Sequence, residues 1–203
     1  MNDSEQSKNN LNKTVRIITQ MGLNMASVLF SKLIKTDANI YIDKIYNEDI
    51  SIVGNDIETN NKEVIAAMVD LVGDAPMKFL FMVPLDDALK ITDLILGKKL
   101  GTTKNFDIYV ESSVQEIGNI MASAISNVFV TTCKIKLLPS PPVVVKNYSS
   151  IIFQEYTFDL ATESNEILIV ESHFDLSATG INCILFLLPC LESKKVLSSI
   201  EGL

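Results

Sequence analysis

The stretch Ser112-Ser-Val-Gln-Glu116-Ile-Gly-Asn119-Ile-Met decides how this chain is interpreted. Apolar residues recur here at the spacing of a helix that buries one face: Val114, Ile117, Met121, Ala124 and Val128. At about 100° per residue, four polar residues fall together on the opposite side: Ser112, Glu116, Asn119 and Ser123. The pattern therefore predicts an amphipathic helix within residues 103–130.

The polar side of this predicted helix pairs a carboxylate with a carboxamide, Glu116 and Asn119. Solvated helix faces favour Lys and Glu, which propagate helices well, whereas Asn does so poorly. The pair is therefore a candidate for a function other than solubility. The ordinary alternative is that a charge and an amide on a wet helix face serve only solvation.

Length and composition indicate one globular domain or two small repeats that share a core. The chain has 203 residues, of which 47% are hydrophobic and 21% charged. Its formal charge of −8 disfavours nucleic acid and anionic membranes as partners, since both require clustered Lys and Arg. Residues 1–10 are polar, lack the apolar segment of a signal peptide, and are expected to be a disordered tail.

The longest apolar run, Cys183–Leu191, is far shorter than the ~20 residues that a membrane span needs. We therefore expect a cytoplasmic protein without membrane insertion. The three cysteines, Cys133, Cys183 and Cys190, show no CxxC spacing, so reduced thiols are expected.

His173 is the only histidine, and it follows Glu171 on the polar side of a predicted strand. One histidine without a cysteine pair leaves too few soft ligands for zinc, so no metal site is predicted. A Ser-His-Asp triad would depend wholly on His173, for which the default interpretation is a surface residue. Neither GxGxxG nor GxxxxGK occurs, so the standard nucleotide-binding loops are unsupported.

Periodicity and turn residues place the remaining elements. Besides residues 103–130, helices are predicted over residues 11–35, 85–96, 147–156 and 191–200. Strands are predicted over residues 39–46, 77–83, 134–138, 143–145, 167–176 and 181–188. A loop is predicted over residues 54–61, while residues 63–72 fit either a helix or the first strand of a hairpin.

The order of elements repeats within the chain. A helix and strand at residues 11–46 match those at residues 107–138, and the strand and helix at 77–96 match those at 181–200. The predicted fold is therefore α+β, a pseudo-two-fold duplicated domain over residues 11–203 with repeats at about 11–100 and 107–203. Its helices pack on a mainly antiparallel sheet. An offset of 99 residues matches Ile17 with Glu116 and Gln20 with Asn119, so the first repeat lacks the acid.

At this level the sequence resembles the CheC family of chemotaxis phosphatases, which includes CheC, CheX and FliY, and it is closest to CheC. The family pattern is Asp or Ser, then Glu, Asn and Pro at fixed spacing, and it is met by Ser112, Glu116, Asn119 and Pro142. The surrounding Glu-Ile-Gly-Asn-Ile-Met wording also matches. CheC usually carries two such sites, and Ile17 and Gln20 depart from the pattern, which implies a degenerate first site.

The resemblance implies a phosphatase of phosphorylated CheY, the response regulator of chemotaxis signalling. Asn119 would orient the attacking water and Glu116 would anchor the partner, with Ser112 and Pro142 as supporting motif residues. No cofactor of its own is implied, because the partner supplies Mg²⁺. An Asn neither gains nor loses a proton near neutral pH, so its amide can position water without titrating.

The resemblance suggests a second partner, the receptor deamidase CheD. The family uses the segment that begins at Asn147 and Tyr148 for that contact, although residues 147–153 also fit an ordinary core helix. Two functional hypotheses therefore stand side by side: a phosphatase, or a non-enzymatic binding module that regulates a partner such as CheD. A chance match of the motif on an unrelated globular domain is the third, plainer interpretation.

Overall fold

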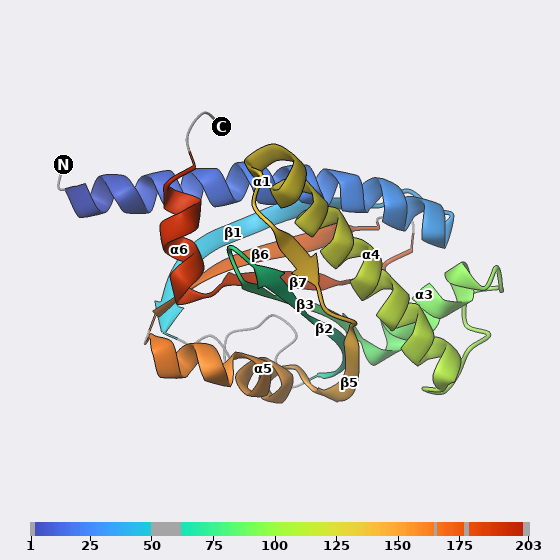
Figure 1. The fold of residues 1–203 in the computed structure, drawn as a ribbon. Coiled ribbons are helices and arrows are strands. Elements are labelled where there is room, and N and C mark those ends of the chain that lie inside the picture. The colour runs from blue at the N-terminus through green and yellow to red at the C-terminus, as the bar shows by residue number, and fades with distance from the viewer. Residues whose placement is uncertain (1–2, 50–61, 165, 177–178, 201–203) are drawn as a thin grey trace.

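One antiparallel sheet forms the centre of the molecule (Figure 1). The computed structural model describes residues 3–49, 62–164, 166–176 and 179–200, so the predicted loop at 54–61 lies outside the described residues. The helices are α1 (Asp3–Ile34), α3 (Leu85–Ile95), α4 (Ile108–Cys133), α5 (Ser149–Glu163) and α6 (Leu191–Ser198). The strands are β1 (Asn39–Asp49), β2 (Glu63–Gly73), β3 (Met77–Pro84), β4 (Leu137–Pro139), β5 (Val143–Tyr148), β6 (Glu166–Asp175) and β7 (Ile184–Pro189).

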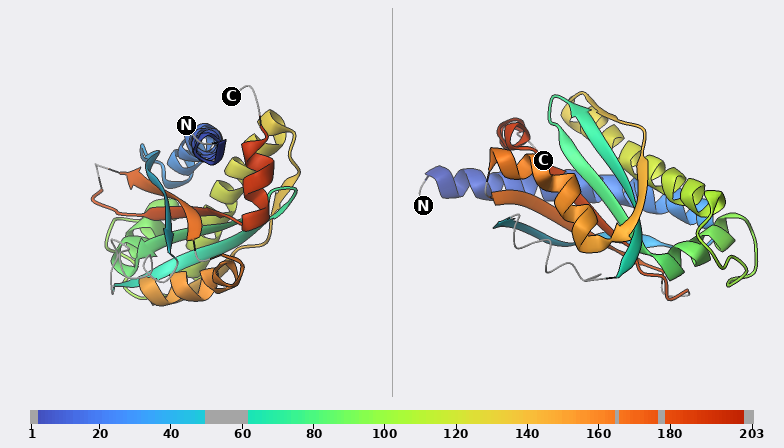
Figure 2. Two further views of the ribbon diagram at one scale, coloured as in Figure 1. Left: turned by 90° about the vertical axis from the view of Figure 1, so that its left-hand side faces the viewer. Right: turned by 90° about the horizontal axis from the view of Figure 1, so that it is seen from below.

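Helices cover both faces of this sheet, which confirms the predicted α+β fold. The larger core lies between the sheet and the helices α1, α3, α4 and α6, and it includes Phe30, Phe81 and Phe129. A smaller core on the other face packs α5 against the sheet through Phe153 and Phe186 (Figure 2). The apolar stripe predicted for α4 is buried in the larger core.

Residues 63–72, for which the sequence fitted either a helix or a strand, belong to strand β2. This strand is central: it pairs with β3 on one side and with β4 and β5 on the other. A strand covered on both faces is apolar on both faces, so Val64 to Ala67 are all buried and show no alternation. The hairpin predicted at Gly73 is confirmed by the antiparallel register of β2 with β3.

The strand order has the symmetry expected of two repeats. It runs β1-β6-β7-β3-β2-β4, with β5 also paired with β2. The order reads the same from either edge once β1 is matched with β4 and β5, β2 with β6, and β3 with β7. Both β3 and β7 end in proline, Pro84 and Pro189, and lead directly into the helices α3 and α6.

The two edges of the sheet differ in one respect that matters for the site. Edge strand β1 is continuous but bulged, because its register against β6 shifts between Ile42 and Lys44. The opposite edge is broken into β4 and β5 by Ser140, Pro141 and Pro142. The bulge residue Asp43 and Pro142 are separated by the same 99-residue offset that aligns the two long helices.

Helix α1 begins earlier than predicted. It starts at Asp3, so residues 3–10 are helical instead of a disordered tail, and its first turns extend beyond the sheet (Figures 1 and 2). The segment contains neither Gly nor Pro, and acidic residues near a helix start favour the helix.

The predicted helix at 147–156 is also displaced. Asn147 and Tyr148 end strand β5, where they pair with Val64 and Glu63 of β2, and α5 begins only at Ser149. Backbone pairing with a central strand therefore overrides the local helical pattern at these two positions.

Within the described residues, one helix is long and apolar enough to cross a membrane by length and composition alone, Leu11–Ile34 of α1. One side of this helix is fully buried in the larger core, where Val15, Ile18, Leu23 and Phe30 are inaccessible to solvent. It therefore has the packing of a core helix.

Candidate functional site

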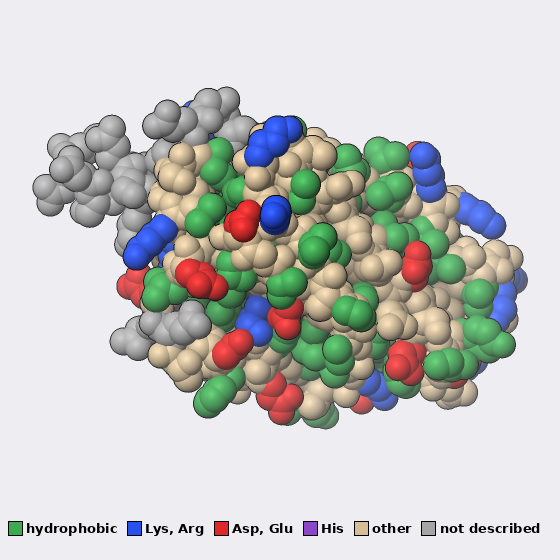
Figure 3. All heavy atoms as spheres, in the orientation of Figure 1, with side chains coloured by type: hydrophobic (Ala, Val, Ile, Leu, Met, Phe, Trp, Pro, Cys, Tyr) green, Lys and Arg blue, Asp and Glu red, His purple; other side chains and the backbone are tan. Residues whose placement is uncertain are grey.

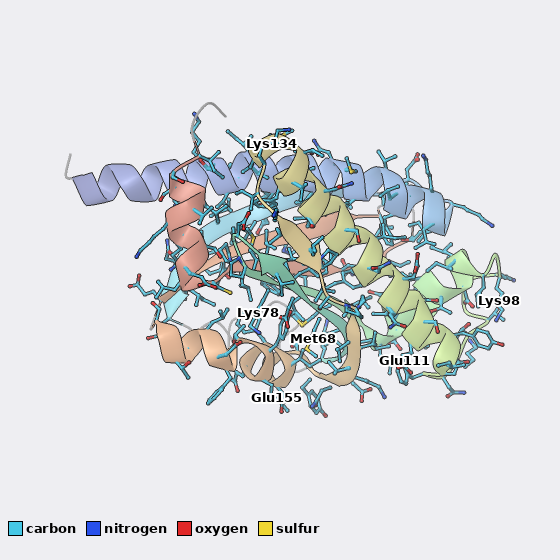
Figure 4. All side chains as sticks on the ribbon, viewed as in Figure 1. Met68, Lys78, Lys98, Glu111, Lys134 and Glu155 are labelled. Atoms are coloured by element: carbon cyan, nitrogen blue, oxygen red, sulfur yellow. The ribbon has the colours of Figure 1, made fainter. Side chains whose placement is uncertain are left out.

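Helix α4 carries the predicted catalytic pair, and polar contacts fix both of its ends. The side chain of Asp107 accepts hydrogen bonds from the backbone N–H groups of Tyr109 (3.0 Å) and Val110 (3.1 Å), which caps the helix start. At the other end Lys134 is left-handed (φ 60°), and its Nζ donates to the carbonyl of Thr131. Glu111 and Lys134, labelled in Figure 4, mark the two ends of this helix.

Gly118, within the motif itself, brings α4 close to the sheet. A Cβ atom built on Gly118 would lie 2.6 Å from the Cβ of Ala67 on β2, closer than real Cβ atoms approach. Only glycine therefore allows the helix to sit at this height above the strand. Because Gly118 faces the sheet, its neighbours Glu116 and Asn119 face away from it.

The structure places the polar motif residues together on the outer side of α4. Ser112, Glu116 and Asn119 are all exposed, and Ser123 is half-buried. In the described part of the chain, the side chains of Glu116 and Asn119 make no hydrogen bond or ion pair with other residues. Two adjacent polar groups with no internal partner are therefore presented to solvent.

Pro142 lies beside the same turn of α4. Its Cβ is 3.8 Å from the position a Cβ would take on Gly118, and its carbonyl accepts a hydrogen bond from Gln115 Nε2 at 3.4 Å. The break between β4 and β5 is therefore held against the helix, one turn before Asn119. The sequence analysis did not identify Gln115 as a site residue. Its position one turn before Asn119, next to the polar side of α4, could have indicated it.

This arrangement suits recognition and water positioning better than metal binding. Glu116 is a negative hydrogen-bond acceptor, while the Asn119 carboxamide both donates and accepts. Among the described residues, the three-ligand grouping of His and acidic side chains lies elsewhere, on β1 and β6, and not on α4. The exposed polar side of α4 thus offers one carboxylate, Glu116, and one amide, Asn119, to a partner.

The corresponding positions in α1 have a different role. Ile17 and Gln20 are half-buried. The side chain of Gln20 accepts from the backbone N–H of Ile42 (3.3 Å) and donates to Asn24 Oδ1 (2.9 Å). Gln20 thus links α1 to the bulged edge strand β1. Its side chain is already hydrogen-bonded within the protein, whereas the side chain of Asn119 is exposed to a partner.

The segment suggested for CheD binding is at the junction of β5 and α5 and is not part of α4. Tyr148 is 50% exposed at the junction of β5 and α5, and its N–H donates to Asn147 Oδ1 at 2.8 Å. In the helix that follows, Ile152 and Phe153 are buried in the smaller core, as the ordinary interpretation predicts, whereas Ile151 is exposed.

The outer surface around α4 is mixed in character. In the space-filling view from this side, apolar and charged side chains are interspersed instead of forming one large patch (Figure 3). Exposed apolar residues include Ile108 and Tyr109 at the start of α4 and Val143 directly after Pro142. His173 is on strand β6 and is not part of α4.

Comparison with solved structures identifies the fold. FliY from Thermotoga maritima superposes with a TM-score of 0.73 at 17% identity, covering 92% of this chain and 93% of that one. A chain of the FliG–FliM complex from H. pylori gives 0.66 at 12% identity, covering 95% and 98%. A chain of the CheX–CheY–BeF3–Mg²⁺ complex from Borrelia burgdorferi gives 0.55 at 16% identity, covering 83% and 94%.

No protein-family model matches the sequence, and no curated protein matches it significantly. The likeness is therefore one of structure. It confirms the resemblance drawn from the motif at the level of the fold: this chain has the fold of FliY, FliM and CheX.

Proposed function

We propose that this protein hydrolyses the aspartyl phosphate of a CheY-type response regulator, with its active site on α4. The observation that carries the proposal is the exposed Glu116–Asn119 pair, which has no internal partner among the described residues. Its spacing to Ser112 and Pro142 follows the family pattern. The structural neighbour from Borrelia burgdorferi, solved with CheY, supports this choice of partner.

Asn119 is the group proposed to position the attacking water. Its carbonyl oxygen accepts from that water while its N–H₂ donates, so the amide fixes both position and orientation without changing protonation. Phosphoryl transfer needs little covalent help from the enzyme, because placing the nucleophile in line with phosphorus supplies much of the rate. One well-placed amide is therefore a sufficient catalytic contribution from this chain.

Glu116 is proposed to anchor the partner. It lies one turn before Asn119 on the same edge of α4, so a cationic side chain of the partner that bound it would bring the phosphoryl group next to Asn119. The Mg²⁺ ion belongs to the response regulator, and this chain contributes only Glu116 and Asn119. The exposed apolar side chains of Ile108, Tyr109 and Val143 offer contact area for a protein partner around the polar pair.

A non-enzymatic binding module is the alternative function. It is supported by the chain of the FliG–FliM complex, which has the same fold and was solved bound to another protein. It is also favoured by the structural use of Gln20 in the first repeat. In this case the exposed segment at Tyr148 would bind a regulated partner such as CheD, and Glu116 and Asn119 would be a remnant.

The two functions are separated by following the decay of a phosphorylated response regulator with and without this protein. We expect the wild type to accelerate the decay and Asn119→Ala to lose about 10²–10³-fold of the added rate. Asn127→Ala is a matched control, because Asn127 is also exposed on α4 but lies two turns further on. Equal activity of the Asn119 and Asn127 variants, or no acceleration by the wild type, would refute the phosphatase proposal.

A further inference from the structure

A second cluster of functional side chains lies at the β1 edge of the sheet, away from α4. One ligand atom each from Asp43, Glu171 and His173 lie within 4.8 Å of one another. Nε2 of His173 is 3.1 Å from Oε1 of Glu171. An imidazole nitrogen and two carboxylates are ligands typical of a divalent first-row metal ion.

The fold brings these residues together across the chain. On β6, Leu168, Val170 and Phe174 face the larger core, so Glu171 and His173 face the opposite side of the sheet with Ile167 and Ile169. The β1 bulge lies beside Glu171, because the register passes from Ile42 opposite Ser172 to Lys44 opposite Glu171. The extra residue in that bulge is Asp43, and a bulge re-aims the side chain it carries.

The cluster combines a buried ligand with more exposed ones. The side chain of Glu171 is 8% exposed, that of His173 22% and that of Asp43 38%. The hydroxyl of Tyr46 donates to Oε2 of Glu171 at 3.1 Å, which leaves Oε1 directed toward His173. A second hydrogen bond of this kind is what orients a metal-binding carboxylate.

One cation already competes for this position. Nζ of Lys44 is 3.5 Å from Asp43 Oδ2, and the Lys44 side chain is 57% exposed. The two carboxylates outnumber this one ammonium group, so the charge of the cluster still favours a divalent ion.

His173 also lines a cavity of about 540 Å³ that opens next to the cluster. Its other walls include Lys62, Asp87, Lys90 and Asn182. A metal ion that used only three protein ligands would keep a coordination position for water or for a small molecule entering from this side.

We infer that Asp43, Glu171 and His173 form a binding site for a divalent transition-metal ion, with Zn²⁺ and Mn²⁺ as the ions that suit its nitrogen and oxygen ligands. Bond lengths of about 2.0–2.2 Å require ligand atoms roughly 3.4 Å apart, a small contraction of the present cluster. The exposed Asp43 side chain is the one that would move. This site is independent of the proposed phosphatase function.

The test is to titrate Zn²⁺ and, separately, Mn²⁺ into untagged, chelator-treated protein by calorimetry and NMR. We expect one ion per chain, and because His173 is the only histidine, its ring resonances report the site alone. Mn²⁺ should broaden those resonances first. Since Mn²⁺ binds thiolates weakly, its binding excludes the three cysteines as the ligands.

Substitutions provide the controls. His173→Gln and Asp43→Asn should each weaken binding at least tenfold, and Tyr46→Phe should weaken it about 10–100-fold through the orientation of Glu171. Lys44→Gln should tighten binding, because it removes the competing cation. Glu192→Gln, which changes an exposed carboxylate on α6, should change nothing. Thermal melts without metal verify that each variant folds.

The absence of stoichiometric binding of either ion would overturn the assignment. So would binding that His173→Gln and Asp43→Asn leave unchanged in folded protein. In either case the cluster would be a hydrogen-bonded group that joins β1 to β6 and nothing more.

Discussion

Gly22 of α1 lies directly against the backbone of Ile125 of α4: a Cβ atom built on Gly22 would be 2.8 Å from the Ile125 Cα. The two longest helices therefore cross where one of them has no side chain. Both helices also connect to the edge strands that follow them. Ser27 accepts from the N–H of Ile40, and Ser126, at the corresponding position, donates to the carbonyl of Leu137.

Gly22→Ala should destabilise the protein although alanine is the better helix former. The added methyl has no room at the crossing, and overpacking typically costs about 1–3 kcal/mol, more than the roughly 1 kcal/mol gained in helix propensity. Urea unfolding measures the difference. Met21→Ala, on the exposed side of the same helix, should stay within about 0.5 kcal/mol of wild type. A more stable Gly22→Ala variant would show that the helices can separate freely.

Gly118→Ala should be destabilising for a similar reason and should be partly rescued by Ala67→Gly. The clash is between two Cβ atoms, 2.6 Å apart, so removing the one on β2 makes room for the other. Ala67→Gly alone should cost about 0.5–1 kcal/mol in the strand. We expect the double variant to be more stable than the sum of the single effects predicts, as measured by a double-mutant cycle in urea. Strict additivity would contradict the contact.

Glu116→Gln should weaken docking more than it slows chemistry. The substitution keeps the shape of the side chain and removes its charge, so KM should rise while kcat changes little, in contrast to Asn119→Ala. The difference from wild type should shrink as salt is added, because screening weakens the same attraction in the wild type. Glu111→Gln, exposed on the first turn of α4, is the control. A fall in kcat equal to that of Asn119→Ala would assign Glu116 to the chemical step.

Asp93→Asn should make the free energy of unfolding depend less on pH in the acidic range. Asp93 is fully buried, and burial raises its pKa. The hydroxyl and N–H of Thr103 and the N–H of Thr102 donate to its carboxylate, outweigh burial and hold the pKa below the ordinary value for Asp. A carboxylate with a lowered pKa stabilises the fold above its unfolded-state pKa, and this is lost as pH falls through the folded-state value. The variant should lose about 1–3 kcal/mol at neutral pH, and the gap should narrow in acid. A constant gap across the range would contradict an ionised Asp93.

Tyr156→Phe should remove an alkaline loss of stability. Burial and then the charge of Asp70 raise the pKa of Tyr156, whose hydroxyl donates to Asp70 Oδ1 at 3.0 Å. Because the folded state holds the proton, its contribution is complete below the unfolded-state pKa of about 10 and declines above it. The variant should lose about 0.5–1.5 kcal/mol at neutral pH and be flatter above pH ~10. Exposed Tyr41→Phe should keep the wild-type profile.

Tyr156 also shows how α5 is attached to the sheet. Lys78, labelled in Figure 4, is on β3. Its Nζ is 4.4 Å from the centre of the Tyr156 ring and 3.0 Å from Asp159 Oδ2. These contacts of Lys78 join residues that are far apart in the chain, and no local sequence pattern in either segment predicts them.

The elements predicted well are those whose signal is local. The apolar spacing around Ile117 identifies α4, and the same helical geometry places Glu116 and Asn119 on one exposed edge. Residues 63–72 could not be assigned, because a strand buried on both faces loses the alternation that distinguishes strands. Glycine propagates a helix poorly, so local propensity makes Gly22 a weak position in its helix, whereas in the structure it lets α1 lie directly against the backbone of α4.

Contacts between distant segments were beyond the sequence. His173 was expected on the surface, but its side chain is only 22% exposed and forms a hydrogen bond with Glu171. Nothing in residues 39–46 indicates that a bulge would bring Asp43 to these two residues. The sequence predicted no metal site because it showed one histidine; the site inferred above depends on strand pairing.

The symmetric strand order suggests how such a sheet could be built from two copies of one repeat. Since β3 and β7 meet at the centre of the sheet, two separate copies of one repeat could have built the same sheet as a homodimer, with identical sites on both sides. In a single polypeptide the two halves can change separately. In this chain the first half has Ile17 and Gln20 at the matching positions, and Gln20 holds α1 to β1, while the second half presents the exposed Glu116 and Asn119.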